Sequence, residues 1–302
     1  WQPSNATLLI VGNVEPEDAL NQAREYFGGW QPKSGVEQYK RGEIFAPKPA
    51  GGKKVVVLDK EGVTQTQVVL SCPGYFSGYE VWPEHAVLGT ALRNVTTDIL
   101  REGSGVVYSP SVRSRSTLTS SEVMFASNVQ NSAAVFALET YYELLDQVES
   151  GSFPEATFRY AQLQYGNSLV SYMQSQDQLH RAVKNTLAKG QGLERFITLA
   201  DRIASMDTAS LQKTLGPCKE NSIATMVGPK DVVVAQLTEA GIEHEVVDWK
   251  QRGYDMHAEM DPKGAEKAAK KRAKQELKDK KKEEEEAKEK EEEQAEEGEA
   301  KE

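Results

Sequence analysis

An arginine and a tyrosine seven residues apart are the two side chains whose types and spacing best suit a binding or catalytic role. Arg101 ends an apolar helical segment, Gly103 and Gly105 interrupt that helix, and Tyr108 lies in the β-rich segment that follows. Arginine keeps its charge and donates several hydrogen bonds, and a phenol can donate to an oxygen that becomes negative. We therefore expect one cleft to hold both. A surface arginine at a helix C-terminus and a half-buried strand tyrosine would give the same pattern without function.

Other catalytic motifs are missing from the sequence. A zinc-binding H-x-x-E-H helix would need histidine at Val81, before Glu84-His85, or at Ala240, before Glu243-His244. No phosphate loop or dinucleotide-binding glycine pattern occurs. We therefore interpret all four histidines as surface or hydrogen-bonded residues: His85, His180, His244 and His257.

Composition limits the classes of partner. The 302 residues are 38% hydrophobic, enough for a core in one large domain or two small ones. A net charge of -10 argues against a nucleic-acid surface and favours basic or neutral peptides as partners. No apolar run approaches the roughly 18 residues of a membrane span. Cys72 and Cys218 are too few for a disulfide scaffold and lack metal-binding spacing.

The spacing of apolar residues and the positions of glycine and proline predict the helices and strands that would position Arg101 and Tyr108. Residues 1–33 read as strand, turn and helix, and the Gly- and Pro-containing residues 34–52 as a linker. Residues 53–59 and 64–71 predict a hairpin around Glu61-Gly62. A helix is predicted over 82–100, followed by strands over 106–113 and 121–129. Further helices are predicted over 133–149, 155–173, 177–188, 193–204 and 208–215.

The last third of the chain contains a weak internal repeat and a charged tail. Residues 221–228 and the predicted helix 232–240 resemble the strand, glycine and helix near the N-terminus, which suggests two domains of similar design. We assign the main domain to residues 53–250 and a tail to residues 251–302. The tail is basic over 263–282 and acidic over 283–302, so it is a solvated disordered, helical or coiled-coil segment, or an interaction arm.

Residues 100–109, LREGSGVVYS, resemble the LREKxGLAYSV signature of the pitrilysin/insulinase family of zinc metallopeptidases. Residues 3–14, 19–30, 54–59 and 64–74 are similar to family segments in order and spacing. The resemblance implies an α+β fold, a largely antiparallel sheet covered by helices, and residues 1–33 as the end of a preceding similar domain. It also implies that Arg101 and Tyr108 hydrogen-bond the backbone of a peptide substrate.

In this family the zinc is held by an H-x-x-E-H half. The resemblance therefore implies that this chain binds no metal and that the zinc half lies upstream or on a partner chain. Because the sequence begins at Trp1 within such a domain end, we expect an upstream portion. Gly103-Ser104 and Pro110 depart from the family pattern, so the strand is short or the pair has lost its catalytic role. The alternatives to a peptidase half are a structural subunit and a peptide-binding module without turnover.

Overall fold

The computed structural model describes residues 2–32, 51–74, 82–116, 120–188, 192–215, 218–275 and 277–280. Most of the predicted linker, Trp1 and the end of the tail lie outside these residues. The chain divides into two compact units, residues 1–246 and 247–302. No described helix is long and apolar enough to cross a membrane.

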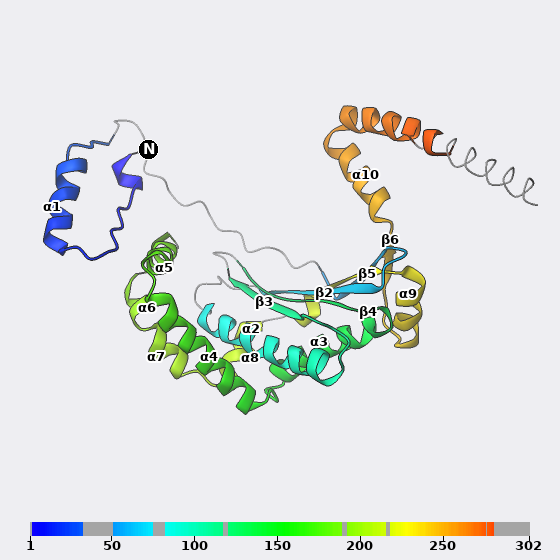
Figure 1. Cartoon of the computed structure of the whole chain (residues 1–302), viewed down its shortest axis with the longest axis horizontal. Helices are drawn as coiled ribbons and strands as arrows, with labels where there is room; N and C mark the ends of the chain where they lie inside the picture. The colour runs from blue at the N-terminus through cyan, green and yellow to red at the C-terminus, as the bar shows by residue number, and fades with distance from the viewer. Residues whose placement is uncertain are drawn as a thin grey trace, which may run out of the picture. The chain divides into compact units, whose positions relative to one another are not determined.

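A six-stranded sheet forms the centre of the first unit, with the order β3-β4-β2-β5-β1-β6 (Figure 1). The pairing of β1 with β5 is parallel, and the pairings of β2 with β4 and β5, and of β3 with β4, are antiparallel. The strands are β1 (Lys54–Asp59), β2 (Gln65–Gly74), β3 (Ser111–Ser116), β4 (Ser121–Gln130), β5 (Ile223–Gly228) and β6 (Glu245–Val247).

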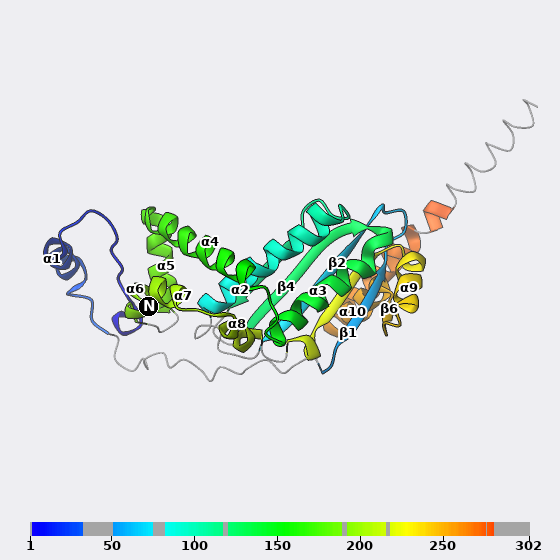
Figure 2. The same cartoon turned by 90° about the horizontal axis from the view of Figure 1, so that it is seen from below.

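Helices cover one face of this sheet, and α2 and α3 run along it (Figure 2). Burial alternates along the strands as this requires: Leu70 and Phe125 are fully buried, and their neighbours are less so. Phe125 stacks on Tyr141 of α3 with 4.8 Å between ring centroids. Such a pair adds about 0.5–1.5 kcal/mol beyond its buried area. The α+β prediction is confirmed.

The remaining helices follow the predicted order closely. One predicted helix, 193–204, is divided at Thr198. The helices of the first unit are α1 (Pro16–Phe27), α2 (Trp82–Thr97), α3 (Ala134–Glu149), α4 (Glu155–Met173), α5 (Gln176–Ala188), α6 (Glu194–Ile197), α7 (Leu199–Ala204), α8 (Thr208–Leu215) and α9 (Lys230–Glu239).

Helix α2 approaches β3 closely at Gly89. A Cβ atom added to Gly89 would lie 2.7 Å from Ser114 Cβ and 3.3 Å from Ser114 N, so only glycine allows this distance between helix and strand. The contact matters because α2 leads directly to Arg101.

The predicted hairpin of residues 53–59 and 64–71 is wrong in its pairing. Strand β5 lies between β1 and β2, in parallel with β1 and antiparallel to β2. A short turn between two β-rich runs indicates only that they are close along the chain. A central position for β5 satisfies its backbone groups on both sides.

The strand predicted near the start of residues 1–33 is not formed: residues 6–12 have no strand pairing, and helix α1 follows. A strand requires hydrogen bonds to a neighbour, and none of the described residues provides one. Aligning Gly12 with Gly228 places Leu8 and Ile10 at the positions of Ala224 and Met226. Ala224 and Met226 are fully buried, whereas Leu8 and Ile10 are 55% and 47% exposed. The apolar pattern of a central strand is present here without a sheet to bury it.

The second unit is helical in its described part. Helix α10 (Trp249–Met260) is capped by Asp248, whose carboxylate accepts hydrogen bonds from the backbone N–H groups of Lys250 and Gln251. Residues 262–275 and 277–280 continue as helix. The Lys270–Glu266 pair, one turn apart at 2.6 Å, is highly exposed and stabilises this helix only slightly.

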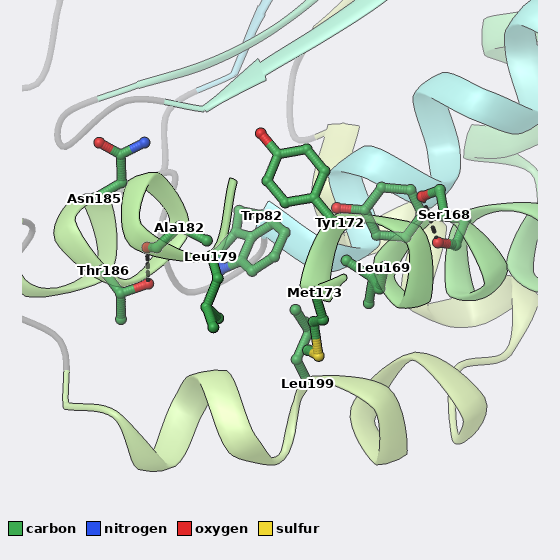
Figure 3. Close-up of a pocket in the computed structure, with 11 residues that line it drawn as sticks. Trp82, Ser168, Leu169, Tyr172, Met173, Leu179, Ala182, Asn185, Thr186 and Leu199 are labelled. Carbon is green, nitrogen blue, oxygen red and sulfur yellow. Dashed lines mark hydrogen bonds between the residues drawn. The ribbon is translucent and has the colours of Figure 1, made fainter. Parts of the chain in front are cut away.

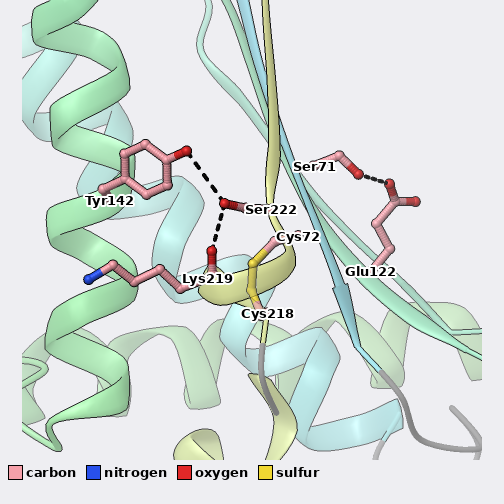
Figure 4. The surroundings of a disulfide bond; sticks show 7 residues. All are labelled: Ser71, Cys72, Glu122, Tyr142, Cys218, Lys219 and Ser222. Atoms are coloured by element: carbon pink, nitrogen blue, oxygen red, sulfur yellow. Dashed lines mark hydrogen bonds between the residues drawn. A yellow bond between two sulfur atoms is a disulfide. The ribbon is translucent and has the colours of Figure 1, made fainter. Parts of the chain in front are cut away.

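A disulfide joins Cys72 of β2 to Cys218, across 146 residues (Figure 4). Sequence analysis did not predict this pairing. Both cysteines are 1% exposed, and Cys218 precedes β5, so the bond links the β2 end of the sheet to the segment that delivers β5. Beside it the Ser71 hydroxyl donates to Glu122 Oε1 at 2.6 Å.

We predict that Cys218→Ser lowers the free energy of unfolding by about 2–5 kcal/mol, because the unfolded chain is no longer cross-linked. Urea unfolding without reductant measures the difference. Wild-type protein in dithiothreitol should match the variant. An unchanged urea midpoint in the variant would contradict the prediction.

His85 on α2 gives a pH-dependent contribution to stability. It is 2% exposed, and burial lowers its pKa from 6.5 to about 4. The unfolded chain therefore binds more protons between pH 6.5 and 4, and stability falls as the pH drops through this window. We expect a loss of about 3 kcal/mol by pH 4 from this residue.

His85→Gln should remove most of this loss, as measured by urea midpoints at pH 7, 5.5 and 4. His257→Gln, at a less buried position on α10, is the matched control and should keep the wild-type slope. Equal slopes in the two variants would rule out His85 as the cause.

Candidate functional site

Arg101 lies in a π-helical turn, Asp98–Gly103, which continues α2. Such turns widen the helix and often occur at functional sites. The Ser104 hydroxyl donates to the carbonyls of Ile99 and Leu100, at 2.9 and 3.1 Å. Gly105 N–H donates to the Arg101 carbonyl at 3.1 Å. These bonds satisfy the carbonyls that the end of a helix leaves unpaired.

The chain then reverses at Gly105, which has a φ of +66° and is the residue type that adopts this conformation without strain. Val106 and Val107 both donate their N–H groups to the Leu100 carbonyl, at 3.1 and 3.3 Å. Val107 forms a β-bridge with Val129 of β4. The turn that carries Arg101 is thereby joined to the sheet.

Tyr108 lies in a β-bulge. Val107 pairs with Val129 and Ser111 with Ala126, so three residues (108–110) oppose two (127–128). Bulges of this kind redirect side chains and are frequent next to active sites. Pro110, which has no N–H to donate, occupies one of the bulged positions. The strand predicted over 106–113 is therefore wrong in its start, and β3 begins only at Ser111.

The turn and the bulge bring Arg101 and Tyr108 together. The Arg101 Cζ atom lies 5.4 Å from the centroid of the Tyr108 ring. The Tyr108 side chain is 82% exposed, and no described residue hydrogen-bonds its hydroxyl. Arg101 Nε pairs with Glu102 Oε1 at 3.2 Å in an exposed ion pair. Because such pairs are weak, Arg101 can exchange Glu102 for a ligand.

The two groups have a common chemistry. Both donate hydrogen bonds, and both donors are accessible, so together they suit carbonyl oxygens along one peptide backbone. Tyr108 is 82% exposed and the Arg101 side chain 47% exposed, so the pair lies on an open surface.

The residues present do not fit a zinc site. No group of three or more potential ligands from histidine, cysteine, aspartate and glutamate occurs among the described residues. Glu84, beside His85 in the sequence, accepts two hydrogen bonds from Arg202, both at 2.9 Å. His85 is buried, with its Nδ1 3.4 Å from the Ser116 hydroxyl.

A cavity of about 320 Å³ lies at the opposite end of α2, between α4, α5 and α7 (Figure 3). Its walls are mostly aromatic and aliphatic, and the polar side chains of Ser168, Asn185 and Thr186 also line it. Burial and the nearby Tyr172 raise the pKa of Tyr165 to about 12. Sequence analysis did not predict the cavity, because its lining residues read as the core face of separate helices.

Solved structures share this fold at low sequence identity. A protease from Helicobacter pylori is 13% identical with a TM-score of 0.61, over 72% of this chain and 54% of that chain. A peptidase M16 inactive domain from Pseudomonas fluorescens is 12% identical with a TM-score of 0.59, over 72% and 52%. A chain of complex III2 from Candida albicans is 15% identical with a TM-score of 0.52, over 72% and 53%.

The present chain spans about half the length of these structures. No curated protein sequence matches it. A family model described as the peptidase M16 inactive domain matches residues 1–165, more than half of the chain. Together with the α+β fold and the Arg101–Tyr108 segment, this match shows that the chain belongs to the peptidase M16 family, as an inactive-domain member.

Proposed function

We propose that this chain is the substrate-holding half of a zinc metalloendopeptidase. The zinc and its H-x-x-E-H helix would be supplied upstream or by a partner chain, and peptides would be the substrate. The chain alone would not hydrolyse them. Arg101 and Tyr108 would bind the substrate backbone near the cleaved bond.

The observation that carries this proposal is the convergence of Arg101 and Tyr108. A π-helical turn and a β-bulge, two irregular features, place the guanidinium 5.4 Å from the phenol ring and leave both exposed. This exposure leaves both donor groups accessible to a substrate, although Arg101 also pairs with Glu102. Loss of one hydrogen-bond donor to a developing oxyanion typically raises the activation free energy by about 2.7–4 kcal/mol.

The N-terminal segment supports a second part of the proposal, that residues 1–33 complete a preceding domain of similar design. Leu8 and Ile10 match buried positions of β5 but are exposed, and α1 has no buried residue. A sheet from the preceding domain would cover them. Burying a leucine or isoleucine stabilises by about 1.5–3 kcal/mol, which gives the two domains a reason to remain together.

The test is to combine the chain with the H-x-x-E-H polypeptide from the same organism and to measure cleavage of an internally quenched peptide. Arg101→Ala and Tyr108→Phe should each lower kcat by about 10²–10³. Arg181→Ala and Tyr160→Phe, which remove the same groups from exposed positions on α5 and α4, are the matched controls. Wild-type turnover in both site variants would refute the assigned role.

A second prediction concerns the turn alone. Gly105→Ala adds a Cβ that meets no atom within 4 Å, but the positive φ strains any residue with a side chain. We expect the substitution to cost about 1–2 kcal/mol and to lower kcat by displacing Arg101 from Tyr108. Gly166→Ala on α4 is the control, because a Cβ added there also has no atom within 4 Å. Unchanged kcat in Gly105→Ala would show that the turn does not position the pair.

A non-catalytic structural subunit is the alternative function. The shared fold with a chain of Candida albicans complex III2 favours it, as does the charged helical tail of the second unit. The two proposals differ in one measurement: a structural subunit would assemble with its partner equally well when Arg101 and Tyr108 are both substituted, and the assembly would cleave no peptide.

A further inference from the structure

The cavity of about 320 Å³ between α2, α4, α5 and α7 has no part in the proposed function (Figure 3). It lies at the start of α2, beside Trp82, whereas Arg101 lies in the turn that ends this helix. The helical rise between these two residues is roughly 28 Å. A ligand in the cavity would therefore not touch a peptide held by Arg101. Ligand pockets measure roughly 300–1,000 Å³, so the cavity suits a small molecule.

Large apolar side chains surround the cavity without being fully buried. Tyr172 is 46% exposed and Met173 is 43% exposed, and Trp82 is half-buried. Figure 3 shows Trp82, Met173 and Leu179, from three different helices, around one space. Apolar cavities of even about 150 Å³ bind benzene, and aromatic rings pack favourably on other rings. Because tryptophan and two tyrosines contribute to these walls, a ligand with an aromatic ring would fit them best.

The cavity has no charged side chain among its described lining residues. Its only ionisable groups there are the phenols of Tyr165 and Tyr172. Burial, and secondarily Tyr172, raise the pKa of Tyr165 to about 12, so this phenol is uncharged at neutral pH. An ionised ligand would lose hydration here without gaining an opposite charge. The lining therefore favours an uncharged molecule.

Two hydroxyl groups of the lining are available as hydrogen-bond acceptors (Figure 3). The Ser168 hydroxyl donates to the Tyr165 carbonyl at 2.7 Å, and the Thr186 hydroxyl donates to the Ala182 carbonyl at 2.9 Å. A hydroxyl has one proton and two acceptor lone pairs. Since both protons are engaged, the two oxygens are left to accept from a donor. A ligand with an O–H or N–H group would supply that donor.

We propose that this cavity binds a small uncharged aromatic molecule that carries an O–H or N–H donor, a phenol or an indole. Its ring would contact Trp82 and Tyr172, and its donor would bond to the hydroxyl oxygen of Ser168 or Thr186. This inference goes beyond the proposed function and does not depend on it, because neither Arg101 nor Tyr108 contributes to the cavity.

The test is equilibrium dialysis of the full chain at pH 7 with three probes that share one ring system. 2-Naphthol is uncharged and has an O–H donor, 2-methoxynaphthalene is uncharged and has none, and 2-naphthoate is an anion. 2-Naphthol should bind more tightly than its methyl ether by about two- to tenfold, the effect of one hydrogen bond. 2-Naphthoate should bind at least about tenfold more weakly than 2-naphthol, because its charge is unpaired.

Substitutions separate the acceptors from the cavity itself. The double variant Ser168→Ala and Thr186→Val should bind 2-naphthol only as tightly as 2-methoxynaphthalene. Thr238→Val on α9 is the matched control, because its hydroxyl also donates to a carbonyl one turn earlier, at 2.8 Å, but lies outside the cavity. Ala182→Trp should fill the cavity and abolish binding of both uncharged probes. Its urea midpoint shows whether it folds, and the double variant decides the matter if it does not.

A peptide side chain is the other source of such a ring. A blocked pentapeptide with one central tyrosine should therefore bind more weakly than p-cresol, the same ring and hydroxyl without a backbone. Tighter binding of the pentapeptide would overturn the assignment to a small molecule. Equal binding of 2-naphthol and its methyl ether, tighter binding of 2-naphthoate, or wild-type binding by folded Ala182→Trp would each overturn the proposal as well.

Discussion

The placement of β5 between β1 and β2 is the constraint on which the rest of the structure depends. β5 joins the two strands by pairing with both, although about half of the chain separates it from them. Such distant pairing requires a large loss of chain entropy, and the Cys72–Cys218 disulfide lowers it by joining β2 to the segment before β5. β2 in turn pairs with β4, and β4 holds Val107 beside the candidate site. The position of Tyr108 thus follows from a chain of strand pairings.

The candidate site is organised by its backbone. Arg101 and Tyr108 are exposed and make few side-chain contacts, so packing alone would leave both mobile. A π-helical turn and a β-bulge instead determine where each side chain leaves the main chain. Both features are joined to β4 by the bridge at Val107 and by the hydrogen bond from Gln130 N–H to the Val106 carbonyl. Backbone hydrogen bonds position two flexible donors without burying them, which leaves them free for a ligand.

The chain carries the same strand-and-helix design twice, with opposite outcomes. β5 and α9 both contribute buried residues to the core, whereas residues 6–12 and α1 contain none. The apolar pattern alone cannot produce a strand, since its hydrogen bonds and its burial both come from neighbours. The chain also spans about half the length of the solved structures that share its fold.

Local patterns in the sequence determined the helices, the Arg101–Tyr108 pair and the family, because helical periodicity and short motifs depend on residues close along the chain. The tertiary structure alone decided which strands are neighbours: β5 separates β1 from β2, contrary to the predicted hairpin. It also decided the disulfide and the bulge at residues 108–110. Each of these arises from contacts between distant segments, and strand pairing over such distances leaves no periodic signal in either segment.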